Sequence, residues 1–208
     1  MIVPFLALML ALAQASPATG DYVPDTGWND DAWSRDFYEG WFGGQLRAMG
    51  EPPLGAPADL GPFAERFRLL VLPTFTPAFA SRIDVGPDGK AILRWADLNG
   101  RGGYEPGTLA REGSRPLRGS ELRRFRSALA AAALGSLRRQ EGDAIVNDAA
   151  GTSTIRLCAD GTTFVFEHLD ASGRQYVVRQ CGIEEKPARR LARLVFDLTG
   201  WKAMERGR

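Results

Sequence analysis

Residues 81–95 read SRIDVGPDGKAILRW, and apolar side chains largely alternate with polar ones on both sides of a turn. Ile83 and Val85 precede the turn, whereas Leu93 and Trp95 follow it. A period of two is typical of a strand that buries one face, and Pro-Asp-Gly is a sequence that favours a tight turn. The stretch therefore predicts an antiparallel hairpin.

Further strands are expected on either side of this hairpin. Residues 67–72 read FRLLVL, a run typical of a mostly buried strand. Residues 104–112 predict a third strand of the same meander, at the edge of the sheet because Pro106 has no N–H to donate. A second meander with an Asp-Gly turn is predicted over residues 153–158, 163–168 and 175–180.

Three helices complete the predicted domain. The first has Trp33, Phe37 and Trp41 at intervals of four residues and ends at Gly50. The other two are expected at residues 120–139 and 187–199, each with an apolar stripe and arginines on the opposite side. The fold class that we predict is α+β, with antiparallel β-meanders packed against three helices, and the mature chain, residues 16–208, is a single domain.

An offset of 72 residues aligns the two halves of this domain. It places Ile83 on Ile155, Gly89 on Gly161 and Tyr104 on Tyr176. The match suggests two duplicated βββα units, over residues 81–138 and 153–199, each needing the other to bury its apolar face. The alternative is chance, since any tight hairpin selects Asp-Gly.

The N-terminus reads MIVPFLALMLALAQA, an apolar run that ends in a small-x-small sequence. These features predict a signal peptide, residues 1–15, cleaved before Ser16, and hence an exported protein of the periplasm or the exterior. The alternative is a buried N-terminal helix, because no Lys or Arg precedes the run. No later stretch is long enough for a transmembrane segment.

The chain has two cysteines, Cys158 and Cys181. An even number is what an oxidising compartment favours, so we expect a disulfide bond between them. The alternative is a pair of buried free thiols. If a third strand separated the two, their Cα atoms would lie about 9 to 10 Å apart, too far for a bridge.

Composition argues against several classes of partner and cofactor. Lys and Arg number 26 against 25 Asp and Glu, so no strong positive field attracts nucleic acid. One histidine and two paired cysteines supply too few ligands for a zinc or redox-metal site. We therefore expect no nucleic-acid partner, no metal and no cofactor.

His168 is the residue that acid-base or nucleophilic catalysis would recruit most readily. None of the common catalytic motifs accompanies it in the sequence. A hydrolase or an inhibitor-type protein with a cleft formed by Glu51, Glu167 and His168 is one alternative function; the other interpretation of His168 is a solvated residue at a strand end.

The first helix carries more aromatic residues than one buried stripe requires. An exposed aromatic patch stacks on a glycan, peptide or protein partner, and charged neighbours add hydrogen bonds. The simpler interpretation is a helix that covers the sheet. The candidate ligand-binding residues that we take from the density of motifs along the chain are Trp41, Arg47, Glu51, Arg82 and Tyr104.

Three motifs of the chain resemble those of a family of uncharacterised exported bacterial proteins. They are WFGGQLRAMGEPPL at residues 41–54, GGYEPG at residues 102–107, and the Asp160-Gly161 hairpin running to Glu167. The resemblance implies an exported location and one fold, and it brings no activity, ligand or catalytic residue with it. Our leading hypothesis is a non-catalytic binding or interaction protein with an envelope protein or a glycan as partner. A purely structural envelope-associated protein is a further alternative.

Overall fold

The computed structural model describes residues 22–23, 32–141, 144–147, 153–156 and 160–201. The predicted signal peptide and Cys158 lie outside these ranges. Export and the Cys158–Cys181 disulfide therefore stay predictions. Within the described ranges, no helix combines the length and the apolar character needed to cross a membrane.

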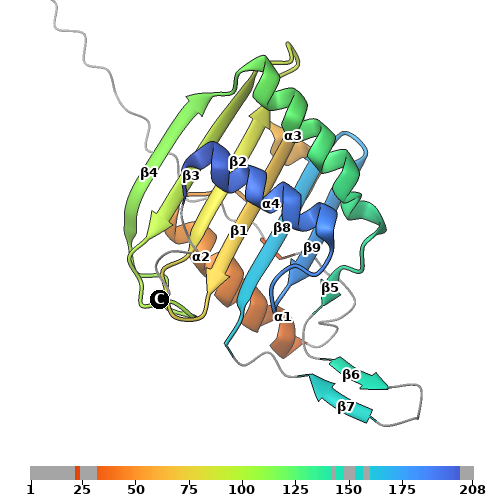
Figure 1. The fold of residues 1–208 in the computed structure, drawn as a ribbon. Coiled ribbons are helices and arrows are strands. Elements are labelled where there is room, and N and C mark those ends of the chain that lie inside the picture. The colour runs from red at the N-terminus through yellow and green to blue at the C-terminus, as the bar shows by residue number, and fades with distance from the viewer. Residues whose placement is uncertain (1–21, 24–31, 142–143, 148–152, 157–159, 202–208) are drawn as a thin grey trace, which may run out of the picture.

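A seven-stranded sheet forms the centre of the protein, with the strand order β4-β3-β2-β1-β8-β9-β5. Six of the strands pair antiparallel, and the short β5 runs parallel to β9. A separate two-stranded hairpin of β6 and β7 projects from one end (Figure 1). The bounds in the sheet are β1 Glu65–Pro73, β2 Phe79–Val85, β3 Ala91–Leu98, β4 Leu109–Pro116, β5 Gln140–Glu141, β8 Thr162–Asp170 and β9 Gly173–Arg179, and those in the hairpin are β6 Ala144–Asn147 and β7 Ser153–Arg156.

Helices cover both faces of this sheet (Figure 1). On one face lie α3, Gly119–Ala132, and α4, Lys186–Thr199. On the other face, α1, Ala32–Tyr38, continues through the π-helical turn η1, Glu39–Gly43, into α2, Gly44–Ala48. Two 3₁₀ turns, η2 at Pro57–Leu60 and η3 at Leu134–Ser136, lie between the larger elements.

Alternate residues of the strands belong to two separate cores. Phe67 and Leu69 of β1 pack with Phe125 of α3 and Leu191 of α4. The intervening Leu70 and Leu72 pack instead with Phe42, Leu46 and Met49 of the first helical segment. Because both faces are covered, β1 is an apolar run rather than an alternating strand.

The α+β prediction is confirmed, and so are the hairpin at residues 81–95 and the edge position of the strand that follows it. That edge strand, β4, begins at Leu109 and not at residue 104, because residues 99–108 form a loop. The third predicted helix, 187–199, is α4. Helix α3 is shorter than the predicted 120–139, since Ala133 adopts a left-handed conformation with φ of 46° and ends it.

The second predicted meander was wrong in its first strand. Residues 153–156 form β7, which pairs with β6 outside the main sheet, so only β8 and β9 of that half join it. Residues 144–146 read AIV, of which Ile145 and Val146 are β-branched, and they supply a partner strand close in the chain. The two halves with an offset of 72 residues therefore differ in the placement of their first strand.

Candidate functional site

A site rich in aromatic residues lies where the first helical segment crosses one end of the sheet. A pocket of about 290 Å³ opens there between α1, η1, the start of β8 and the loop before β4. It is lined by Phe37, Tyr38, Trp41, Leu72, Thr74, Gly103, Tyr104, Gly161, Thr163 and Gln180. We call it the aromatic pocket.

The rings at this pocket form a continuous chain of contacts. The ring centroids of Trp41 and Tyr104 are 4.6 Å apart, and those of Phe37 and Tyr104 are 5.6 Å apart. Trp33 stacks on Phe37 at 5.5 Å and is 73% exposed, while Tyr104 is 63% exposed. The ridge of Trp33, Phe37 and Tyr104 thus leads from the surface to Trp41 in the pocket wall.

Trp41 is held in place by a hydrogen bond as well as by packing. Its indole Nε1 donates to the carbonyl oxygen of Gly103 at 3.1 Å. The loop that carries this carbonyl approaches the end of β1 very closely, since a Cβ atom on Gly102 would lie 2.6 Å from the backbone nitrogen of Thr76. Gly102 also has φ of 95°, where an L side chain is strained. The glycines of the GGYEPG motif therefore place Tyr104 against Trp41.

The polar groups of the aromatic pocket carry no charge. Gln180 donates from Nε2 to the hydroxyl of Tyr38 at 3.2 Å. Thr74 donates from its hydroxyl to the carbonyl oxygen of Gly161 at 2.6 Å, and Thr163 adds a second threonine to the lining. An amide, two threonine hydroxyls and a phenol beside flat rings offer hydrogen bonds and stacking to an uncharged ligand.

The five candidate ligand-binding residues separate into three groups in the structure. Trp41 and Tyr104 meet in the aromatic pocket. Arg47 forms an ion pair with Glu39 and lies over the ring of Tyr22. Glu51 and Arg82 form a buried ion pair on the sheet. The last three residues do not line the aromatic pocket.

Glu51 and Arg82 belong to a row of charges that crosses the sheet. In the strand register Arg94 lies opposite Arg82, Arg82 opposite Arg68, and Arg68 opposite Glu167. Three arginines side by side repel one another, so the row needs carboxylates around it. Glu51 pairs with Arg82 and Arg68, Asp84 pairs with Arg82, Arg66 and Arg94, and Glu167 pairs with Arg68 and Arg174.

The centre of this charge network is buried and its charges are paired. Arg68 and Glu167 have no exposed surface. Burial alone would raise the pKa of the Glu167 carboxyl, yet the charges of Arg68 and Arg174 hold that pKa below its ordinary value. Tyr22 closes the network from above, donating its hydroxyl to the carbonyl oxygen of Glu51 at 2.6 Å. The hydrogen bond of Tyr22 and the ion pairs of Glu51 with Arg68 and Arg82 hold these two segments against the sheet.

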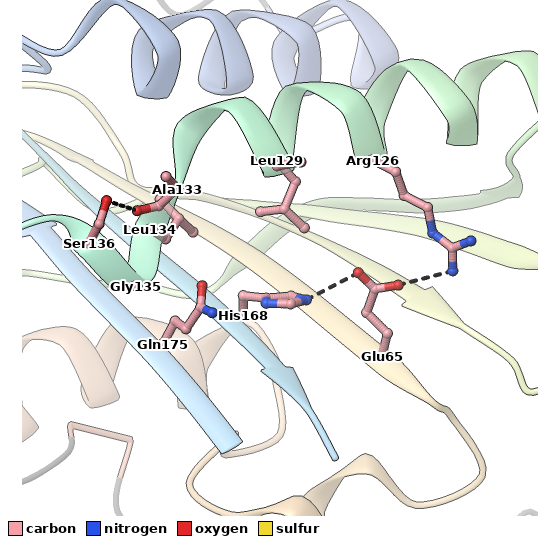
Figure 2. Close-up of a pocket in the computed structure, with 10 residues that line it drawn as sticks. Glu65, Arg126, Leu129, Ala133, Leu134, Gly135, Ser136, His168 and Gln175 are labelled. Carbon is pink, nitrogen blue, oxygen red and sulfur yellow. Dashed lines mark hydrogen bonds and ion pairs between the residues drawn. The ribbon is translucent and has the colours of Figure 1, made fainter. Parts of the chain in front are cut away.

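A second pocket, of about 460 Å³, lies under the end of α3 on the opposite face of the sheet (Figure 2). His168 Nε2 is 3.1 Å from Glu65 Oε1, and Arg126 donates to Glu65 Oε2 at 3.1 Å. The hydrogen bond with His168 is the main cause that holds the pKa of Glu65 below its ordinary value. A carboxylate in this position orients an imidazole ring. We call this set the histidine pocket.

The alternative catalytic set is not assembled into one cleft. Glu51 and Glu167 both contact Arg68 on the face covered by α1 and α2. His168 follows Glu167 directly in β8 and so projects from the opposite face, where it contacts Glu65. Among the described residues, no group of three His, Cys, Asp or Glu side chains is arranged to hold a metal ion.

Several residues of these sites had no place among the predicted ones. Thr74, Thr163 and Gln180 line the aromatic pocket, and Glu65 orients His168. One sequence signal was present for the charge network: Arg68 interrupts an otherwise apolar strand, and a charge in such a position requires a buried partner.

No family model matches this chain, and the search of curated proteins found no matching relative.

Proposed function

We propose that this protein is a non-catalytic binding protein whose ligand is an uncharged saccharide ring held in the aromatic pocket. The observation that carries the proposal is the Trp41–Tyr104 pair, 4.6 Å between centroids, at the mouth of a pocket without a charged lining residue. Sugar rings offer apolar C–H faces to aromatic rings and hydroxyls to amides, threonines and backbone carbonyls. The pocket supplies both kinds of partner.

The size and rigidity of the aromatic pocket favour a single ring over a long ligand. Its volume of about 290 Å³ is just below the range of roughly 300 to 1,000 Å³ that ligand pockets span. The hydrogen bond from Trp41 to Gly103 fixes the indole before a ligand arrives, which reduces the entropy lost on binding. The exposed ridge formed by Trp33, Phe37 and Tyr104 extends the surface for further rings of a chain.

The proposal places the protein in the periplasm or outside the cell. The apolar leader at residues 1–15 and the even number of cysteines support this location. An envelope or extracellular glycan would then be within reach of the aromatic pocket.

The catalytic alternative receives less support, because Glu51, Glu167 and His168 face two different sides of the sheet. Nothing in the arrangement of the described residues favours the purely structural role over binding.

Binding of neutral oligosaccharides to the mature chain tests the proposal. A glycan array identifies the ligand, and calorimetry compares wild-type protein with Tyr104→Ala. Since one aromatic contact is worth about 0.5 to 1.5 kcal/mol, we expect a loss of affinity of about two- to tenfold. Tyr104 is largely exposed, so the variant should keep its fold.

Phe75→Ala is the matched control. Phe75 is 72% exposed, similar to Tyr104, but does not line the aromatic pocket. Its removal should leave the affinity unchanged. An array with no neutral glycan bound, or equal losses in both variants, would contradict the proposal.

A further inference from the structure

The outer surface of the α3–α4 layer carries a groove remote from the aromatic pocket. The two helices lie side by side on the face opposite α1 and α2 (Figure 1), and the groove of about 640 Å³ follows their seam. Its apolar lining consists of Ala128, Ala131, Pro187 and Leu194, the last of which is largely buried. Both helices use their inward faces for the core, so this seam faces away from the sheet.

Four arginines line this groove. Arg123 and Arg124 come from α3, and Arg190 and Arg193 come from α4. Asp197 is the one acidic residue among the lining residues, which leaves three positive charges in excess. The protein as a whole has a net charge of only +1, so the groove concentrates charge that the rest of the surface balances.

Within the part of the chain that the structure describes, the groove arginines differ from their neighbours in having no acidic partner. Arg126 of the same helix pairs with Glu65, and Arg115 and Arg118 both pair with Glu121. None of the four groove arginines forms an ion pair with any residue that the structure describes. All four are exposed, so their guanidinium groups are accessible to a ligand in solution.

We propose that the groove binds an acidic amphipathic helix of a partner protein. A helix laid along the seam would place apolar side chains on the exposed Ala131 and Pro187 and on the half-buried Ala128, and its flanking carboxylates would reach the arginines. Guanidinium groups bind carboxylates in a bidentate geometry. A phosphate backbone or a lipid surface would pair with the arginines but would not contact the apolar lining. The presence of both arginines and apolar residues in one groove therefore favours a helix as the ligand.

Fluorescence anisotropy of a labelled synthetic peptide tests this assignment. The peptide carries leucines at i, i+3, i+4 and i+7 with glutamates on both flanks. We expect wild-type protein to bind it, and Arg190→Gln/Arg193→Gln to weaken the binding about tenfold. The double variant Arg35→Gln/Arg101→Gln removes two exposed arginines outside the groove and should bind as wild type does.

Three results would overturn the assignment. The first is a peptide with Gln in place of every Glu that binds equally well, which would remove the role of charge. The second is an equal loss in the two double variants, which would indicate a non-specific field. The third is a DNA duplex or a phosphatidylglycerol vesicle that displaces the peptide and depends on the same two arginines.

Discussion

Buried charges explain why particular residues occur inside strands that should be apolar. Arg68 lies within the run FRLLVL, and its side chain is fully buried against Glu167. Because Glu167 lies directly opposite Arg68 in the strand register, the two side chains form an ion pair while both strands keep regular geometry. The same carboxylate also binds Arg174, so removing it would leave two guanidinium groups without their shared partner.

Glu167→Gln should therefore destabilise the protein strongly. Breaking a buried ion pair by removing one member costs about 3 to 5 kcal/mol, and urea unfolding measures this loss. Glu112→Gln is the control, because Glu112 is exposed on β4 and should change the free energy of unfolding by no more than about 0.5 kcal/mol. Equal stability of the two variants would contradict the structural role of the network.

Glu65 should make stability depend on pH through its contact with His168. Its pKa is lowered in the folded protein, so its contribution is complete above the pKa of the unfolded chain, about 4.3, and is lost as the pH falls through the lower folded value. The difference in unfolding free energy between wild type and Glu65→Gln should thus be largest near neutral pH and shrink below about pH 4. If the difference in unfolding free energy between the two proteins increased on acidification, the stabilising role of the Glu65 carboxylate would be contradicted.

Local motifs predicted the positions of helices and strands better than they predicted which strands pair with each other. Alternation and Pro-Asp-Gly identified β2 and β3, and the four-residue spacing identified the first helix up to Gly50. The π-helical turn at Glu39–Gly43 within that helix could not be predicted from the spacing of apolar residues. Pairing depends on which strand edge is free, so the placement of β7 with β6 did not follow from the pattern of β7 itself.

The loop that carries Tyr104 gives a test at one of its glycines. Gly102→Ala should destabilise the protein by about 1 to 3 kcal/mol and weaken saccharide binding, because the new Cβ meets the Thr76 backbone and φ is positive. Gly40→Ala is the matched control, since Gly40 lies in the helical segment and a Cβ atom added there would have no neighbour within 4 Å. That control should be neutral or stabilising in thermal unfolding. Equal effects would contradict the close approach of the loop.

The complete fold creates sites that no stretch of sequence contains. Trp41 and Gly103 are 62 residues apart in the chain, and Glu65 and His168 are 103 residues apart. Glu65 and His168 meet because β8 pairs with β1, whereas Trp41 meets Gly103 because the first helical segment lies against the loop between β3 and β4. The density of motifs predicted five ligand-binding residues, of which the fold brings Trp41 and Tyr104 together in the aromatic pocket and places Arg47, Glu51 and Arg82 elsewhere.

The central claim is that a neutral saccharide binds in the aromatic pocket, in contact with Trp41 and Tyr104. The most direct measurement is a nuclear magnetic resonance titration of the tryptophan indole N–H signals with the saccharide selected on the array. The account predicts that the Trp41 signal shifts and saturates, because its Nε1 lies at the pocket wall bonded to Gly103, while the signal of Trp201, packed on Phe79, stays unchanged. A Trp41 signal that does not move at saturating ligand would contradict it.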